Sequence, residues 1–132
     1  MSNLITIKSS IENLRLVEKF VDEVYEEYKF SDEIYGNILI ATMEAANNAI
    51  MHGNKNDEKK HVEIRLQKNK SDLEFTVKDE GTGFDFKSIP DPTSPENVEK
   101  ISGRGVFLME KLSDKIEFLE NGRIVKLTFK LR

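Results

Sequence analysis

Three segments in which apolar and polar residues alternate constrain the fold of this chain more than any other feature. They are HVEIRLQ at 61–67, LEFTVKD at 73–79 and RIVKLTFKLR at 123–132. A period of two over five or more residues predicts strands with one buried face and one polar face. The last segment follows an Asn121-Gly122 pair, which predicts a hairpin turn. A sheet of such strands needs a second layer to cover its apolar face.

Three stretches with helical periodicity can supply that second layer. The first covers residues 11–28, and Ser9 and Glu12 at its start have the spacing of a capping box. The second covers residues 31–53, and the third, GRGVFLMEKLSD at 103–114, predicts a helix that is entered through glycines. With LITIK near the N-terminus as a further strand, we expect about five strands and three main helices. The predicted fold class is therefore α+β, a two-layer sandwich in which helices cover one face of a mixed, mostly antiparallel sheet.

The composition limits the classes of function. A length of 132 residues fits one domain, which we expect to span residues 1–132. No apolar run reaches about 18 residues and no secretory signal is visible, so we expect no membrane partner and a cytoplasmic location. The lack of cysteine excludes disulfides and thiol chemistry, and two histidines argue against a zinc site. The formal charge of −4 argues against direct binding of nucleic acid.

Asp79 is the most informative polar residue of the alternating segments. Leu73, Phe75 and Val77 define the buried face of their segment, and Asp79 continues the same parity. A carboxylate that leaves water needs a hydrogen-bond donor, because burying it unpaired is unfavourable. The glycines of the EGTGFD sequence that follows remove side chains beside this carboxylate. They allow either a plain turn or the close approach of a ligand.

A second polar group lies on the helix predicted for residues 31–53. At about 100° per residue, Asn48 falls inside the apolar arc of this helix, and Glu44 lies at the edge of the arc one turn earlier. One interpretation is structural, with Glu44 at the polar margin and Asn48 as a hydrogen-bonded core amide. The other is chemical, because an amide oxygen can hold a hard cation and a nearby carboxylate can take a proton.

The third group is the GRG sequence at 103–105. Glycines at the start of a helix expose N–H groups that can bind phosphate, although neither of the usual phosphate-binding loop motifs occurs in this chain. The three groups together are more specific than any one of them. An inward carboxylate can accept from the exocyclic amine of adenine, and a helix start can hold phosphates. With a loop between the glycines that follow Asp79 and the GRG sequence, they predict an ATP site under a lid.

These motifs resemble those of the GHKL ATPase superfamily, and most closely those of the bacterial anti-sigma-factor serine/threonine kinases. EAANNAIMHGN at 44–54 matches the N box, DEGTGFD at 79–85 the first glycine box, and GRGVFLM at 103–109 the second. The resemblance extends over nearly the whole chain. It implies the histidine-kinase-like ATPase fold, with an ATP lid at about residues 86–102.

The resemblance also implies roles for individual residues. Glu44 would be the catalytic base, which receives the proton of an attacking serine or threonine hydroxyl. Asn48 would coordinate the Mg²⁺ that bridges the phosphates of ATP. The other residues implied to contact ATP, the first three at adenine and the last three at the phosphates, are Asp79, Gly81, Gly83, Gly103, Arg104 and Gly105.

The function implied by the resemblance is that of an ATP-dependent protein kinase that acts as an anti-sigma factor. Its substrate would be an anti-anti-sigma partner, and the resemblance further implies a sigma factor as second partner and a homodimer. A nucleotide-gated binding module without phosphotransfer shares the same motifs and stays open as an alternative. The catalytic half of a sensor histidine kinase is disfavoured, because the chain has no separate phosphoacceptor helix and His52 and His61 are poorly placed for that role.

One departure from the superfamily pattern concerns the last predicted strand. Many members place a threonine near the start of this strand to brace the adenine-binding aspartate, but this chain has Arg123 and Ile124 there. Thr128 comes too late in the strand to be an obvious substitute. The departure predicts either weaker adenine binding or a water molecule in place of the hydroxyl.

Overall fold

The computed structural model describes residues 3–81 and 101–131 of the chain. The elements in chain order are β1 (Leu4–Lys8), a 3₁₀ turn η1 (Ile11–Asn13), α1 (Leu14–Tyr28), α2 (Asp32–Asn48), a π-helical turn η2 (Ala49–Gly53), β2 (His61–Lys68), β3 (Asp72–Lys78), α3 (Ile101–Leu112), β4 (Lys115–Leu119), a short turn η5 (Glu120–Gly122) and β5 (Ile124–Lys130).

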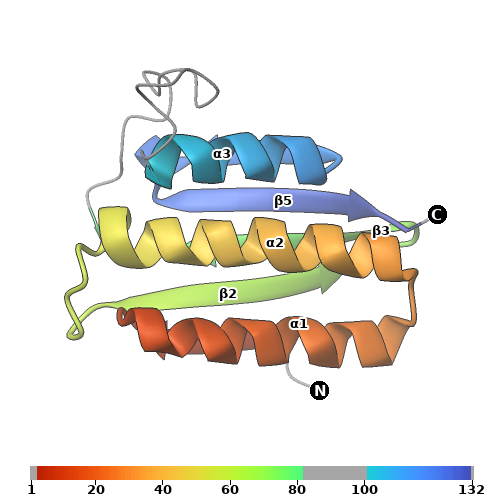
Figure 1. Ribbon diagram of the computed structural model, residues 1–132, viewed down its shortest axis with the longest axis horizontal. Coiled ribbons are helices and arrows are strands. Elements are labelled where there is room, and N and C mark those ends of the chain that lie inside the picture. Colours follow the sequence, from red (N-terminus) through yellow and green to blue (C-terminus); the bar gives the residue numbers. More distant parts are fainter. Residues whose placement is uncertain (1–2, 82–100, 132) are drawn as a thin grey trace.

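The strands form one sheet in the order β1-β2-β3-β5-β4, and the neighbouring pairs are antiparallel. The three helices lie side by side across one face of this sheet (Figure 1). The predicted α+β class, with helices on one face, is therefore confirmed. The predicted hairpin is also confirmed, because η5 joins β4 to β5 with Asn121 and Gly122 at positive φ. Within the described residues, no helix is long and apolar enough to cross a membrane.

The core lies between the sheet and the helices, where the period-two residues of the strands meet the apolar stripes of the helices. Phe75 of β3 is the centre of this core, since its ring contacts Phe20 of α1 edge-on at 6.3 Å and Phe129 of β5 at 6.0 Å between centroids. Each of these rings is buried. Edge-to-face contacts of this kind add stability beyond the area they bury.

The capping box predicted from Ser9 and Glu12 is wrong. η1 begins after Ser10, whose side chain makes no capping bond. Ser9 is buried instead, and its hydroxyl donates to the carbonyl of Lys60 at 2.8 Å. The tertiary bond to the loop before β2 has replaced the local one, which sequence spacing could not reveal.

A crossed pair of tyrosine–aspartate hydrogen bonds joins the end of α1 to the start of α2. The hydroxyl of Tyr25 donates to Asp32 Oδ1, and that of Tyr35 donates to Asp22 Oδ1. The two tyrosine rings lie 4.8 Å apart between centroids. The hydrogen bond to Asp22 raises the pKa of Tyr35 to about 12, and the bond to Asp32 raises the pKa of Tyr25.

This pair predicts a loss of stability at high pH. Because the folded-state pKa of Tyr35 lies above its ordinary value of 10.0, the stabilising contribution is complete below that pH and disappears as the pH rises to about 12. Urea unfolding between pH 9 and 12, in roughly half-unit steps, should show a steeper loss of stability for the wild type than for Tyr35→Phe. Identical pH profiles for the two proteins would contradict the contribution of this bond.

Candidate functional site

The C-terminal end of α2 carries Glu44 and Asn48 one helical turn apart, and α3 packs against them at Gly105. A Cβ atom built on Gly105 would lie 3.0 Å from Glu44 Oε2 and 3.0 Å from Asn48 Nδ2. Such contacts are tighter than ordinary van der Waals packing. The glycine therefore lets the backbone of α3 approach the two polar side chains directly, and the structure brings these three predicted residues together.

The side chain of Asn48 is buried but unpaired. The residue is 2% exposed, and neither its Oδ1 nor its Nδ2 has a hydrogen-bond partner in the described part of the chain. An amide left in this state destabilises the fold by about 1–3 kcal/mol per unpaired group, so it requires an explanation. Binding of a hard cation by the amide oxygen would explain the unpaired state. Asn48 therefore fits the role of Mg²⁺ ligand that was predicted for it.

The protein does not offer a complete metal cage around Asn48. Residues 3–81 and 101–131 contain no group of three or more histidine, cysteine, aspartate or glutamate side chains that could hold a metal ion. Magnesium usually keeps only one or two protein ligands and takes the rest from substrate phosphates and water. The donor set is consistent with a cation that arrives together with a nucleotide.

Glu44 is half-buried, and its burial raises the pKa of its carboxyl group, while the positive charge of Arg104 opposes that shift. Arg104 itself is exposed at the start of α3. A carboxylate with a raised pKa accepts a proton more readily than one in water. The position beside Asn48 and Gly105 therefore suits a general base.

The prediction that a helix is entered through Gly103 and Gly105 is wrong in its boundary. α3 already begins at Ile101, so both glycines lie inside the helix. The N–H groups of the first helical turn, which include that of Gly103, have no partner within the helix. Gly105 lies two residues further on, and its contribution is the close packing on α2 rather than a free N–H group.

Asp79 lies immediately after β3 and is 3% exposed, as the parity of its strand predicts. Its backbone N–H donates to the carbonyl of Arg123 at 3.0 Å, and its Oδ1 accepts from the N–H of Gly81 at 2.8 Å. Burial raises the pKa of Asp79. The Gly81 hydrogen bond and the charges of Arg123 and Lys60 counteract part of this shift. The local turn and the inward carboxylate, which were alternatives at the level of sequence, are thus both present.

Gly53 packs directly on Asp79, and nothing in the sequence pattern singles it out. A Cβ atom on Gly53 would lie 2.2 Å from Asp79 Oδ2, and one on Gly81 would lie 1.9 Å from the carbonyl oxygen of Gly53. Gly53 ends the π-helical turn η2, which continues α2 from Asn48. π-Helical turns are rare overall, but those that occur are often found at functional sites. This turn carries the chain from the Asn48 region to the Asp79 region.

A methyl group at residue 53 should be much more disruptive than one in the middle of α2. Gly53→Ala is expected to lower the free energy of unfolding by about 1–3 kcal/mol, because the carboxylate of Asp79 must move. Gly36 provides the matched control, since nothing lies within 4 Å of a Cβ atom built there. Gly36→Ala should raise stability by about 0.5–1 kcal/mol through helix propensity. Urea unfolding of both variants would contradict the packing argument if their effects had the same sign.

The residue that meets Asp79 across the sheet is Arg123 and not a threonine. Strand register places Lys78 opposite Ile124, and Asp79 then meets the carbonyl of Arg123. Thr128 lies opposite Glu74, towards the other end of β3. The expectation that Thr128 is too far along the strand to brace Asp79 is therefore confirmed.

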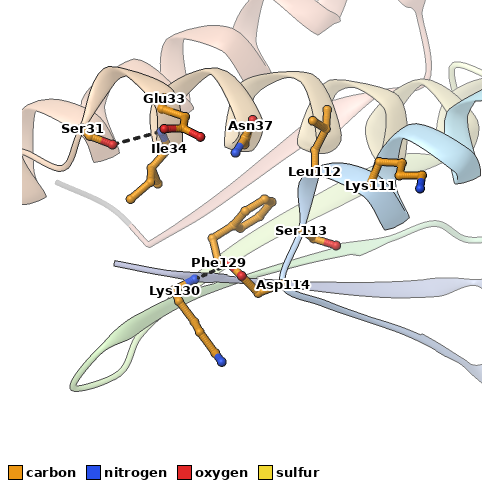
Figure 2. Close-up of a pocket in the computed structure, with 10 residues that line it drawn as sticks. All are labelled: Ser31, Glu33, Ile34, Asn37, Lys111, Leu112, Ser113, Asp114, Phe129 and Lys130. Carbon is orange, nitrogen blue, oxygen red and sulfur yellow. Dashed lines mark hydrogen bonds between the residues drawn. The ribbon is translucent and has the colours of Figure 1, made fainter. Parts of the chain in front are cut away.

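A hollow of about 450 Å³ lies at the other end of the helical layer, between the start of α2 and the end of α3 (Figure 2). Several of its polar groups already serve the fold. Ser31 Oγ caps α2 by accepting from the N–H of Ile34 at 3.2 Å, and Asp114 Oδ2 accepts from the N–H of Lys130 at 2.8 Å. Ten residues of helix, or about 15 Å, separate Ile34 from Glu44. This hollow is not part of the candidate site.

The described residues do not include every predicted site residue. Gly83 and residues 86–100 of the predicted lid lie outside them. The remaining predicted residues fall into two clusters that η2 connects. Glu44, Asn48 and Gly105 form the first, and Gly103 and Arg104 precede Gly105 on α3. Asp79 and Gly81 form the second.

Comparison with known proteins gives consistent results. The family model described as Histidine kinase-like ATPase domain matches residues 7–129. A Serine-protein kinase RsbW of Bacillus subtilis is 37% identical over 91 residues, which is 64% of this chain and 56% of that protein. One from Listeria innocua is 31% identical over 106 residues, which is 75% of this chain and 68% of that protein. The chain thus spans little more than half the length of the Bacillus relative.

A solved structure of RsbU and RsbW domains from Mycobacterium tuberculosis has the same fold. It superposes with a TM-score of 0.65 over 98% of this chain and 33% of that chain, at 17% sequence identity. At this identity the likeness concerns the fold alone. The predicted histidine-kinase-like ATPase fold is confirmed.

Proposed function

The chain belongs to the family of histidine kinase-like ATPase domains, and from this premise we propose that it is an ATP-dependent protein kinase that phosphorylates a serine or threonine hydroxyl. The observation that carries the proposal is the unpaired, buried amide of Asn48 next to the half-buried carboxylate of Glu44, under a glycine of α3. The similarity to proteins named Serine-protein kinase supports a hydroxyl as the acceptor.

In the proposed mechanism, the side-chain oxygen of Asn48 would hold a Mg²⁺ ion that accompanies the triphosphate. The ion, when bound, would neutralise negative charge on the phosphates, which is the main requirement of phosphoryl transfer. The first-turn N–H groups of α3, including that of Gly103, donate to phosphate oxygens, since the N-terminal end of a helix is partly positive. Arg104 adds a positive charge at the same end.

Glu44 receives the proton of the attacking hydroxyl. As the oxygen of the partner's serine or threonine bonds to the γ-phosphorus, the bond from phosphorus to the bridging oxygen breaks and ADP leaves. The hydroxyl proton passes to a carboxylate oxygen of Glu44 and later returns to water. Burial makes this carboxylate more basic than one in solvent, which favours the transfer.

Asp79 provides the contact with the purine. An ionised carboxylate in a desolvated position is a strong acceptor for the exocyclic amine of adenine. Gly81 and Gly53 keep side chains away from this carboxylate, and the N–H of Gly81 fixes one of its oxygens. The other oxygen is thereby held in one orientation for a ligand.

The physiological role that fits this activity is that of an anti-sigma factor, which captures a sigma factor and phosphorylates an anti-anti-sigma partner. We propose this role, a homodimeric state and a cytoplasmic location from the resemblance to the anti-sigma kinases.

To test the kinase activity, the protein would be incubated with MgATP and a candidate anti-anti-sigma protein, followed by intact-mass measurement of that partner. A gain of one phosphate, about 80 Da, supports the kinase. ATP-dependent retention of the partner without any mass change would favour a nucleotide-gated binding module instead.

A further inference from the structure

Asn54 makes three side-chain hydrogen bonds to three separate parts of the chain, although no catalytic role has been assigned to it. The residue is 1% exposed. Its Oδ1 accepts from the N–H of Glu80 at 2.7 Å, and its Nδ2 donates to Ser9 Oγ at 2.8 Å and to the carbonyl of His61 at 3.0 Å. One amide group thus joins the chain after β1, the start of β2 and the residue that follows Asp79.

The bond from the Glu80 N–H to Asn54 lies next to Asp79 in the chain. Glu80 lies between Asp79 and Gly81. Its backbone N–H donates to Asn54 Oδ1, and the next N–H, that of Gly81, donates to Asp79 Oδ1. Its side chain also accepts from the N–H of His61. Gly53, which precedes Asn54, packs against the carboxylate of Asp79 and against Gly81. Residues 53 and 54 therefore contact the Asp79–Gly81 segment at its beginning, middle and end.

We infer that Asn54 is the positioning residue of the purine end of the site: it holds the Glu80 N–H so that the Asp79 carboxylate faces the adenine amine. The inference rests on the proposed function. The Glu80 bond makes Asn54 more than a general stabiliser, because it lies one residue from the proposed adenine ligand. The Ser9 bond, at the opposite side of the same amide, leads only to the carbonyl of Lys60.

The two sides of the amide provide a matched pair of variants. Asn54→Ala removes the acceptor of the Glu80 N–H, whereas Ser9→Ala removes a buried hydroxyl at the far side and leaves that acceptor in place. Both variants lose buried hydrogen bonds and both should unfold at lower urea concentration. Only Asn54→Ala should alter the purine end.

Two probes separate the ends of the site by calorimetric titration. Adenosine tests the purine end, and inorganic tripolyphosphate with Mg²⁺ tests the phosphate end. Asn54→Ala should bind adenosine about tenfold more weakly or worse and should bind tripolyphosphate within about twofold of the wild type. Ser9→Ala should bind both probes as the wild type does. An equal loss for both probes, or an unchanged affinity of Asn54→Ala for adenosine, would overturn the inference.

Amide hydrogen exchange adds a measurement that needs no nucleotide. In the wild type and in Ser9→Ala, the Glu80 amide should exchange on the order of 100-fold more slowly than an unprotected amide, and in Asn54→Ala this protection should disappear. A rapidly exchanging Glu80 amide in the wild type refutes the inference even if Asn54→Ala does not fold. A wild type that binds neither probe would refute the proposed function itself, which distinguishes the two failures.

Discussion

Asp79→Asn is expected to bind ATP roughly 10- to 100-fold more weakly than the wild type while remaining at least as stable in the absence of nucleotide. The affinity falls because a neutral amide replaces a charged acceptor, and hydrogen bonds to charged groups contribute about 1.5–3 kcal/mol. The stability does not fall, because the substituted side chain would keep an oxygen for the Gly81 N–H and would remove a buried charge.

The pH dependence of stability provides a second test of the Asp79→Asn variant. Burial raises the folded-state pKa of Asp79, so its contribution to stability is greatest below its ordinary pKa and is lost as the pH rises through the raised value. In Asp79→Asn this loss should be absent, and the difference between variant and wild type should therefore grow from acid to neutral pH. Urea unfolding across that range measures it.

Glu74→Gln is the matched control for Asp79→Asn. Glu74 lies on the same strand, β3, but on the polar face of the sheet, where it pairs in register with Thr128. The substitution removes the same charge and should leave ATP binding unchanged. If calorimetry gives equal ATP affinities for Asp79→Asn and Glu74→Gln, the role of Asp79 in binding is wrong.

Glu44→Gln is expected to reduce the rate of phosphate transfer to the partner by about 10²- to 10⁴-fold, the usual contribution of a general base. ATP affinity should change less than about threefold, since the hydroxyl proton is transferred only during the reaction. The fold should tolerate the change, because burial already disfavours the charged form of Glu44. Radiolabel transfer from ATP gives the rate, and calorimetry gives the affinity.

Glu33→Gln is a suitable comparison for Glu44→Gln, because Glu33 lies on the same helix in its first turn, at the opposite end from Asn48. That variant should transfer phosphate at the wild-type rate. Full activity of Glu44→Gln would assign the base to another group. A parallel loss of ATP affinity in Glu44→Gln would instead mean that Glu44 supports binding rather than chemistry.

The parts of this structure that the sequence predicts are those set by short-range periodicity. Alternation in 73–79 places Leu73, Phe75 and Val77 in the core, and the same parity buries Asp79. The Asn121-Gly122 turn follows in the same way, because its positive φ angles suit those two residues. Strand order, by contrast, depends on contacts between distant segments and cannot be read from the pattern.

The features that the sequence did not reveal depend on tertiary contacts. The spacing of Ser9 and Glu12 predicts a cap, but Ser9 is used by Lys60 and Asn54 instead. The start of α3 ahead of Gly103 could not be located from the glycines alone, since glycine is tolerated inside a helix. Gly53 acquires its importance only when Asp79 is placed against it.

Recognition of ATP by the proposed kinase depends above all on the contact between Asp79 and the 6-amino group of adenine, and a comparison of two nucleotides tests this contact. Calorimetric titration would compare MgATP with the magnesium complex of purine riboside triphosphate, which lacks that amino group, for the wild type and for Asp79→Asn. The wild type should prefer ATP by about tenfold or more, and Asp79→Asn should bind the two nucleotides equally. A preference of the same size in both proteins, or none in the wild type, would show that Asp79 does not recognise the purine.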